Sequence, residues 1–279
     1  MTRANLGRLG LMAVAAVWIF SVPVSTQWDA YKWKNVPRTP DGKVDLNAPP
    51  RRTPDGKVDL SGFWVPGGDS VKHLLNLAAD MKEADIPLQP WARALYQERI
   101  DNNGKDHPGA RCWPSGIPEK DNIPDGLKIV QTPDLMLFLH DSRTIFRQIF
   151  TDGRPLPKLS DTEPAWLGYS VGRWEGDDFV VESIGFRDHG WLSANMAWPN
   201  SDALHVTERW HRRDFGHLEE TVTIDDPKAY LKPWTNKVVL TLQADTELLD
   251  SYCDNQSIMQ AHYSMGPRPE EPASPPAGK

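Results

Sequence analysis

The chain has 279 residues, of which 39% are hydrophobic and 25% are charged, and this balance predicts a globular protein with a substantial core, not a membrane bundle. Its net charge of -7 argues against nucleic acid as a partner, because phosphate binding needs a concentrated basic surface and no long run of Lys and Arg supplies one. The 12 Trp and 25 Pro residues indicate many irregular connections and large aromatic side chains that serve either core packing or a ligand site.

The first 26 residues have the plan of a secretory signal peptide. Arg3 and Arg8 precede an apolar run from Leu9 to Val22, and small residues follow it. The run is shorter than the ~20 residues that a membrane-spanning helix needs, which favours cleavage over the alternative of a retained anchor. We therefore expect a periplasmic or secreted protein with no stable membrane insertion after signal cleavage.

An internal duplication follows the signal segment. The nonapeptide RTPDGKVDL occurs at residues 38–46 and again at 52–60, and Pro-Asp-Gly in each copy is typical of a turn. Two copies are too few for a solenoid. We predict an extended arm over residues 27–60, in which the second copy leads into the folded domain and the first is dispensable. A single β-rich domain is expected over 61–265, followed by a Pro-rich, disordered tail over 266–279.

Two short helices are expected on the N-terminal side of the β-rich domain. The first begins near Val71 with Leu and Ala on one side and stops at Pro87. The second has Pro90 in its first turn and ends at Gly104, a residue type that suits the C-terminal end of a helix. These helices would cover one end or one face of the sheet.

Cys112 and Cys253 are the two cysteines of the chain. In an exported protein such a pair predicts a disulfide, and closing a loop of ~140 residues contributes up to about 4 to 5 kcal/mol by chain entropy. Two buried thiols are the alternative. Neither cysteine has a Cys or His at metal-ligand spacing, so we expect no metal there, and no cofactor is indicated.

The first predicted hairpin, LMLFLHDSRTIFRQIF, turns at Ser142-Arg143, so residues whose numbers sum to 285 lie opposite each other. One of its faces is wholly apolar, and we expect that face to form the core. The other face sets two polar side chains, His140 and Arg147, among apolar ones. The apolar face consists of Leu135, Leu137, Leu139, Phe146 and Phe150.

The second hairpin turns at Gly176-Asp177 and has an apolar face of Trp174, Phe179 and Val181. Its other face mixes Tyr169, Arg173 and Glu182 with aliphatic residues. A third hairpin turns at Asp214-Phe215-Gly216-His217, and its inward side is undetermined, although Glu208 and Arg209 lie on opposite sides of it. Charged groups on half-apolar strand faces are either solvent-side residues or the polar anchors of a cavity.

The insertion Gly185 to Asp202 separates the second and third hairpins and is a natural lid, because loops this long inside a domain are uncommon unless they are functional. It contains Trp191 and Trp198. Asp188-His189 with His205 lacks HxH or HExxH spacing, so no metal is predicted. GxSxG, P-loop and GxGxxG motifs are absent, which removes the common hydrolase and nucleotide-binding readings.

These elements predict a mainly β fold, an antiparallel meander that forms a barrel or a strongly curled sheet, with two short N-terminal helices. The segments TPDGKVDLSGFW, RQIFTDGRPLP, GYSVGRWEGDDFVVESIGF, SDALHVTERW and VTIDDPKAYLKPWT resemble a large family of uncharacterised secreted bacterial proteins. The resemblance covers most of Arg52 to Asn255 and implies export, but it brings no established reaction and no catalytic residue. The meander also looks like a lipocalin-type barrel, by analogy of fold alone.

The leading functional hypothesis is a binding protein whose cavity holds a small, partly apolar, anionic ligand. Arg147, Arg173 or Arg209 would anchor the ligand under the Trp191 loop. The alternative is a hydrolase, lyase or isomerase that uses Glu182, Glu208 or His140 as acid or base in the same cavity. Glu182 and Glu208 can act as an acid-base pair only if they face each other across the cavity. A third hypothesis is a protein interaction module that presents its Trp-rich loops. The predicted binding residues are His140, Arg147, Trp166, Tyr169, Arg173, Glu182, Trp191, Glu208 and Arg209.

Overall fold

The computed structural model describes residues 32–249 except 74–75, 124–125, 142–144 and 194–195. The chain divides into two units, residues 1–31 and 32–279, and the fold below belongs to the second. The predicted signal peptide and disordered tail lie outside the described residues and stay predictions. Cys253 also lies outside them, so its disulfide with Cys112 stays a prediction.

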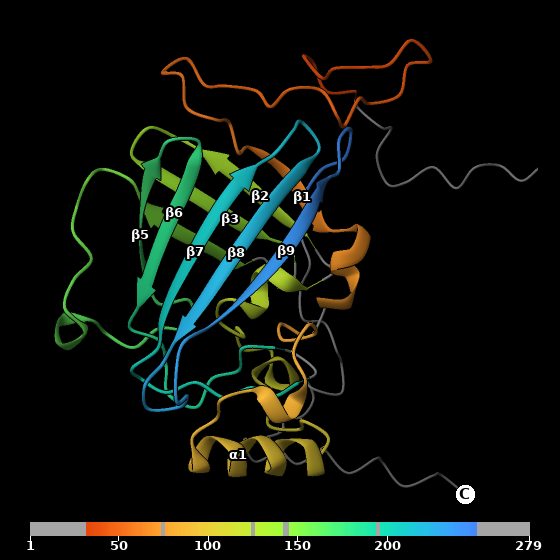
Figure 1. The fold of residues 1–279 in the computed structure, drawn as a ribbon. Coiled ribbons are helices and arrows are strands. Elements are labelled where there is room, and N and C mark those ends of the chain that lie inside the picture. The colour runs from red at the N-terminus through yellow and green to blue at the C-terminus, as the bar shows by residue number, and fades with distance from the viewer. Residues whose placement is uncertain (1–31, 74–75, 124–125, 142–144, 194–195, 250–279) are drawn as a thin grey trace, which may run out of the picture. The chain divides into compact units, whose positions relative to one another are not determined.

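Within the described residues, nine strands form a closed barrel, and each strand pairs with its neighbours in chain order until β9 closes against β1 (Figure 1). The predicted mainly β barrel is therefore confirmed. The strands are β1 (Gly62–Pro66), β2 (Leu127–Gln131), β3 (Leu135–His140), β4 (Ile145–Phe150), β5 (Tyr169–Glu175), β6 (Asp178–Ile184), β7 (His205–Arg212), β8 (His217–Asp225) and β9 (Trp234–Leu242).

One seam of the barrel is parallel, which the predicted antiparallel meander did not include. Ile149 pairs with Ser170 and Phe150 with Val171 between β4 and β5, whereas the other pairings of the described strands are antiparallel. Each antiparallel pairing reverses the strand direction, so a ring with an odd number of strands closes only if at least one pairing is parallel. The segment 151–168 makes the crossover that this parallel pairing requires.

The predicted hairpin registers are confirmed, since Phe138 lies opposite Arg147 and Arg173 lies opposite Val180. The core face assigned to the first hairpin was wrong. Phe138 is fully buried inside the barrel, whereas Phe146 on the wholly apolar face is 60% exposed. The reason is that Arg147 finds buried hydrogen-bond partners inside the barrel, and strand alternation then turns the apolar face outward.

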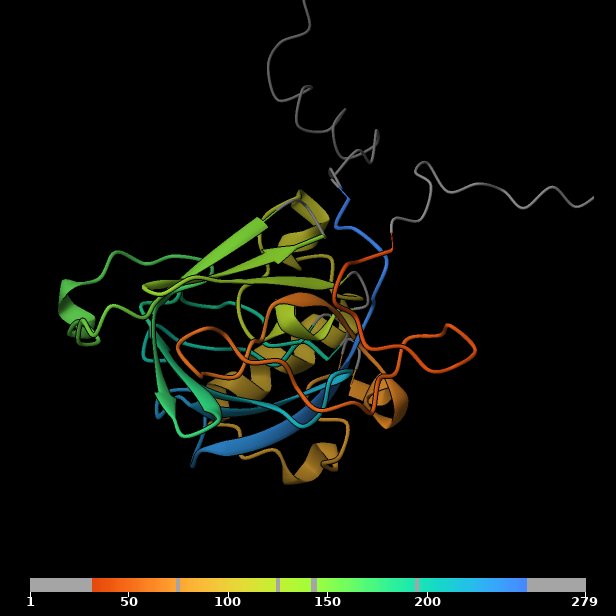
Figure 2. The ribbon, with the colours of Figure 1, turned by 90° about the horizontal axis from the view of Figure 1, so that it is seen from above.

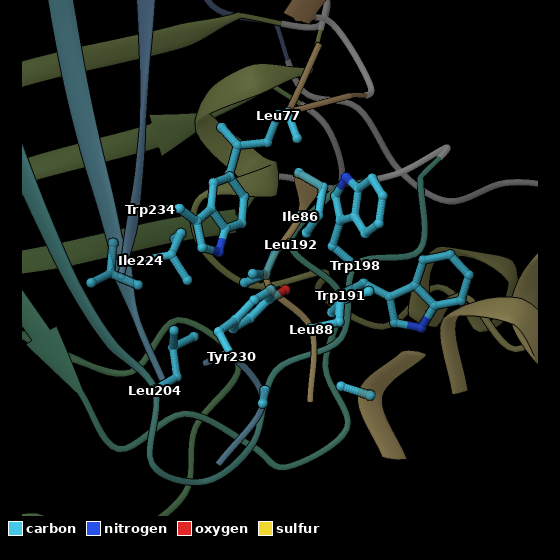
Figure 3. Packing of buried hydrophobic residues seen from close by; sticks show 14 of the residues in the cluster. Leu77, Ile86, Leu88, Trp191, Leu192, Trp198, Leu204, Ile224, Tyr230 and Trp234 are labelled. Atoms are coloured by element: carbon cyan, nitrogen blue, oxygen red, sulfur yellow. The ribbon is translucent and has the colours of Figure 1, made fainter. Parts of the chain in front are cut away.

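The barrel interior contains two apolar clusters. The arm-side cluster includes Val58 and Leu60 of the arm together with interior residues such as Trp64 and Trp210. The helix-side cluster is shown in Figure 3, where Leu77, Leu192, Trp198, Tyr230 and Trp234 pack together. On β7, β8 and β9 a polar side chain lies between members of the two clusters: Glu208 on β7, Glu220 on β8 and Asn236 on β9.

The second predicted helix is confirmed as α1 (Pro90–Asp101), and Gly104 follows it with a left-handed φ of 64°. The first predicted helix is not confirmed. Its described residues form 3-10 helices at Gly68–His73 and Glu83–Asp85, with turns over 77–80 between them. The Leu77 amide donates to Ser193 Oγ at 2.8 Å. No helix of the described residues is long and apolar enough to cross a membrane.

The duplicated nonapeptide folds into the same turn twice. Arg38 bridges to Val44 in the first copy, and Arg52 bridges to Val58 in the second. The arm runs over the end of the barrel opposite α1, which Figure 2 shows from above. Gly216 in the β7–β8 turn donates its amide to the Leu46 carbonyl at 2.7 Å, which ties the arm to the barrel.

Candidate ligand-binding site

A cavity of about 660 Å³ opens between the predicted lid and two neighbouring loops. The lid insertion supplies six of its eleven lining residues, and the loops before β2 and β5 supply the rest. The lining residues are Asp106, Pro108, Trp113, Pro164, Trp166, Phe186, Arg187, Asp188, His189, Trp191 and Asp202. Pockets of roughly 300 to 1,000 Å³ hold drug-sized molecules, so the cavity is large enough for one.

Aromatic rings form two sides of this cavity. The rings of Trp113 and Trp166 lie 5.8 Å apart, centroid to centroid, at an interplanar angle of 39°. Trp113 is 44% exposed, so a large apolar surface faces the solvent-filled space. Trp191 is buried and packs edge-on against His107 at 4.7 Å. The arrangement offers flat apolar walls to a planar ligand.

Arg187 is the cation available to a ligand here. Its guanidinium carbon lies 5.2 Å from the centre of the Trp166 ring, and within the described part of the chain its side chain forms no ion pair or hydrogen bond. Two neighbouring acidic side chains already have ion-pair partners, since Asp202 pairs with Lys228 at 2.7 Å and Asp188 with His189 at 2.8 Å. The exposed guanidinium of Arg187 can therefore bind the anionic group of a ligand without first breaking an existing ion pair.

The insertion that carries these residues is packed in place by α1. Arg99, which is 4% exposed, donates to the carbonyls of His189 at 2.6 Å and Gly190 at 3.0 Å. Burial lowers the pKa of Arg99 to about 10, which still leaves it charged at neutral pH. Trp198 stacks on Tyr96 of α1 at a centroid distance of 4.4 Å. These contacts tie the described residues of the predicted lid to α1.

A second group of functional side chains lies inside the barrel, in the polar layer between the two apolar clusters. Arg147 forms a two-pronged ion pair with Glu208, in which Nη1 lies 2.9 Å from Oε1. Arg147 also donates to Ser170 Oγ at 3.1 Å and to Ser183 Oγ at 2.8 Å. These four side chains are at most 2% exposed. Their hydrogen bonds offset the cost of burying the two charges.

Other members of the polar layer have fewer partners. Asp121 and Glu220 are fully buried, and no oxygen of either carboxylate has a hydrogen-bond partner among the described residues. Asp121 has longer contacts, at 3.5 Å to Arg147 Nη1 and 3.7 Å to His140 Nε2. Burial raises the pKa of Asp121 to about 8, and the charge of Glu208 adds to the rise. The pKa of Glu220 is raised well above its usual range, chiefly by burial. Burial lowers the pKa of His140 to about 3, so its imidazole is neutral.

Four predicted binding residues lie on the outer surface of the barrel, and three of them are charged. Arg173 pairs with Glu175 and Glu182, and Arg209 pairs with Glu175 and Asp178. Glu182 lies opposite Thr207 on the outer face of the wall, whereas the next residue, Glu208, points inward. Glu182 and Glu208 therefore do not face each other across one cavity, which the acid-base hypothesis required.

The structure divides the predicted site residues among three places. Trp166 and Trp191 line the cavity, and His140, Arg147 and Glu208 lie in the polar layer. Arg173, Glu182 and Arg209 are on the outer surface, as is Tyr169, whose hydroxyl accepts from Arg154 at 3.1 Å.

Sequence reasoning missed Trp113 and Arg187 in the cavity, and Asp121 and Glu220 in the polar layer. The sequence could have indicated Arg187 as a site residue, because it stands beside Asp188-His189 in the predicted lid. Nothing in the sequence indicates Asp121, since the loop that contains it has no periodic pattern.

No protein-family model matches the chain, and no curated protein matches it. The function proposed below accordingly starts from the chemistry of the cavity.

Proposed function

We propose that this protein binds a small planar ligand with one negative charge in the cavity, against the Trp113 and Trp166 rings. The single observation that supports this is the unpaired Arg187 guanidinium over the Trp166 ring, at the edge of a space of about 660 Å³. The rings would cover the apolar faces of the ligand, and Arg187 would bind its anionic group.

The earlier candidates for the anion anchor suit this role less well than Arg187. Arg147 is enclosed in the barrel with Glu208, and Arg173 and Arg209 are held by surface carboxylates. A ligand would have to displace an existing partner from each. Asp106 and Asp202 also lie at the cavity wall, and their charge disfavours ligands with several negative groups.

We further propose that the protein meets this ligand outside the cytoplasm, as a member of the secreted family that its motifs resemble. The predicted signal segment supports export, and two motifs of the resemblance supply lining residues of the cavity, Phe186 and Asp202. The acid-base pair predicted for an enzyme, Glu182 with Glu208, does not line this cavity.

Tryptophan fluorescence provides a direct test, with 2-naphthoate as the anionic probe and 2-naphthylmethanol as its neutral counterpart. We expect naphthoate to quench the fluorescence saturably and to bind at least tenfold more tightly than the alcohol, because a charge-assisted hydrogen bond is worth about 1.5 to 3 kcal/mol. Arg187→Gln should abolish the preference for the anion. Arg173→Gln is the matched control and should bind both probes as the wild type does.

The proposal fails if Arg173→Gln weakens naphthoate binding while Arg187→Gln does not, since the anion would then lie on the outer surface. It also fails if neither probe binds the wild type and native mass spectrometry of protein from its own host shows no bound anion.

A further inference from the structure

We propose that the polar layer inside the barrel binds a divalent metal cation, with Asp121, Glu208 and Glu220 as carboxylate ligands and His140 as a nitrogen ligand. The site is separate from the Trp-lined cavity and independent of the proposed function. It combines four elements of the fold: the loop before β2 and strands β3, β7 and β8.

The carboxylates converge on one point. One oxygen from each of Asp121, Glu208 and Glu220 lies within 4.8 Å of the others. Oxygen ligands about 2.1 to 2.5 Å from a cation are separated by no more than about 4 to 5 Å across it. The three side chains therefore already have the spacing of a coordination shell, without movement of the strands.

His140 supplies a second, independent indication. It is 1% exposed, and within the described residues neither of its ring nitrogens has a hydrogen-bond partner. Its Nε2 lies 3.7 Å from Asp121 Oδ1, at the edge of the carboxylate cluster. The ring nitrogens do not lie within 4.8 Å of all three carboxylates, so the imidazole would have to shift toward the ion to coordinate it. Both oxygens of Asp121 and both of Glu220 also lack hydrogen bonds. Buried polar atoms are hydrogen-bonded in at least about 90% of cases, so six such atoms in one place point to a ligand.

The charge of the layer favours a cation as that ligand. Arg147 pairs with Glu208 and lies 3.5 Å from Asp121, and Lys120, which is also buried, adds one positive charge nearby. When all three carboxylates are ionised, they exceed these two cations by one negative charge, which is costly between two apolar clusters. A bound divalent cation would stabilise the ionised carboxylates and give the bare oxygens and the imidazole a partner.

The donor set selects the class of metal. Three carboxylates and one neutral imidazole suit Mn²⁺ or Zn²⁺, whereas an all-oxygen shell would favour Mg²⁺ or Ca²⁺. Arg147 would act as a positioning residue, because its bonds to Glu208 and to Ser170 and Ser183 fix the carboxylate orientation. Such outer partners commonly hold metal ligands in place.

The experiment uses the full chain stripped with EDTA and then mixed separately with Mn²⁺, Zn²⁺, Mg²⁺ and Ca²⁺. We expect one equivalent of Mn²⁺ or Zn²⁺ to remain after gel filtration, measured by elemental mass spectrometry, and to raise the melting temperature. Mn²⁺ should also lose its free-ion electron paramagnetic resonance signal. Glu220→Gln keeps the side-chain shape and should weaken binding at least tenfold, and His140→Gln provides a second ligand variant.

Glu182→Gln is the matched control, because Glu182 is also a strand carboxylate beside an imidazole but lies on the outer surface. It should bind the metal as the wild type does. The proposal is overturned if the wild type retains none of the four ions and its melting temperature does not respond. It is equally overturned if Glu220→Gln and His140→Gln, whichever of them folds, bind metal with wild-type affinity.

Discussion

Arg147 shows how a single charged residue decides the orientation of a strand. Its guanidinium contacts Glu208 from β7, Ser170 from β5 and Ser183 from β6, so one side chain joins three strands besides its own. Those partners exist only inside the barrel, and alternation along β4 then exposes Phe146. The polar contact therefore outweighs the apolar burial that the outward face would gain.

Arg147→Met should destabilise the protein by about 3 to 5 kcal/mol, because Glu208 would remain buried without its partner. Arg147→Met combined with Glu208→Leu should regain most of that loss, since it removes both charges. Urea denaturation of the two variants and the wild type, followed by circular dichroism, measures the difference. A double variant no more stable than the single one would show that the unpaired charge is not the cause.

The two copies of the nonapeptide in the arm form the same turn but are anchored to different parts of the barrel. Both copies close their turn through the same bonds, from the amide of Thr39 or Thr53 to the carbonyl four residues on, at 2.8 and 2.9 Å. Their anchors on the barrel differ. Arg38 binds Asp245, which is 20% exposed, whereas Arg52 binds Asp177, which is 53% exposed. The first anchor is therefore less screened by water.

Acid should release the first copy of the arm. The hydrogen bond from Arg38 lowers the pKa of Asp245, so this contact contributes stability that is complete above the ordinary aspartate pKa of about 4 and is lost as the pH falls through the lowered value. Pepsin digestion should cut the arm at about pH 2 but not at about pH 4.5. Arg38→Ala should be cut at both, and Arg52→Ala should behave as the wild type; equal cleavage of all three would contradict the prediction.

The closure of the barrel determines where the molecule is weakest. The described strands are odd in number, so one seam must be parallel, and here only two residue pairs join β4 to β5, compared with eight between β7 and β8. Few backbone hydrogen bonds at a seam lower the free energy of local opening. The crossover 151–168 spans this seam and carries Trp166, which lines the cavity.

Backbone amides at the β4–β5 seam should exchange with deuterium faster than those at the β7–β8 pairing. Mass spectrometry of peptic peptides covering residues 145–150 and 205–212 can compare them. Equal protection would mean that interior contacts, and not strand pairing, hold the seam closed.

Sequence patterns predicted which residues lie opposite each other, but not always which way they point. Alternation defines the register of Phe138 and Arg147 without defining an inside, and the usual rule that the apolar face is buried failed because the interior holds a polar layer. The convergence of Asp121 and Glu220 depends on ring closure and on an irregular loop. Neither feature produces a local sequence pattern, so the candidate metal site could not be predicted from the sequence.

The turn formed by each nonapeptide has a practical use. Its own bonds, from Arg52 to the Gly56 carbonyl and from Thr53 to the Lys57 carbonyl, recur as Arg38 to Gly42 and Thr39 to Lys43 in the other copy. Each copy also packs on an apolar surface, since Val58 and Leu60 of one copy belong to the arm-side cluster and Val44 and Leu46 of the other pack against it. A peptide carrying this nonapeptide could therefore be fastened across the mouth of another barrel only where that barrel offers both a carboxylate and an apolar patch.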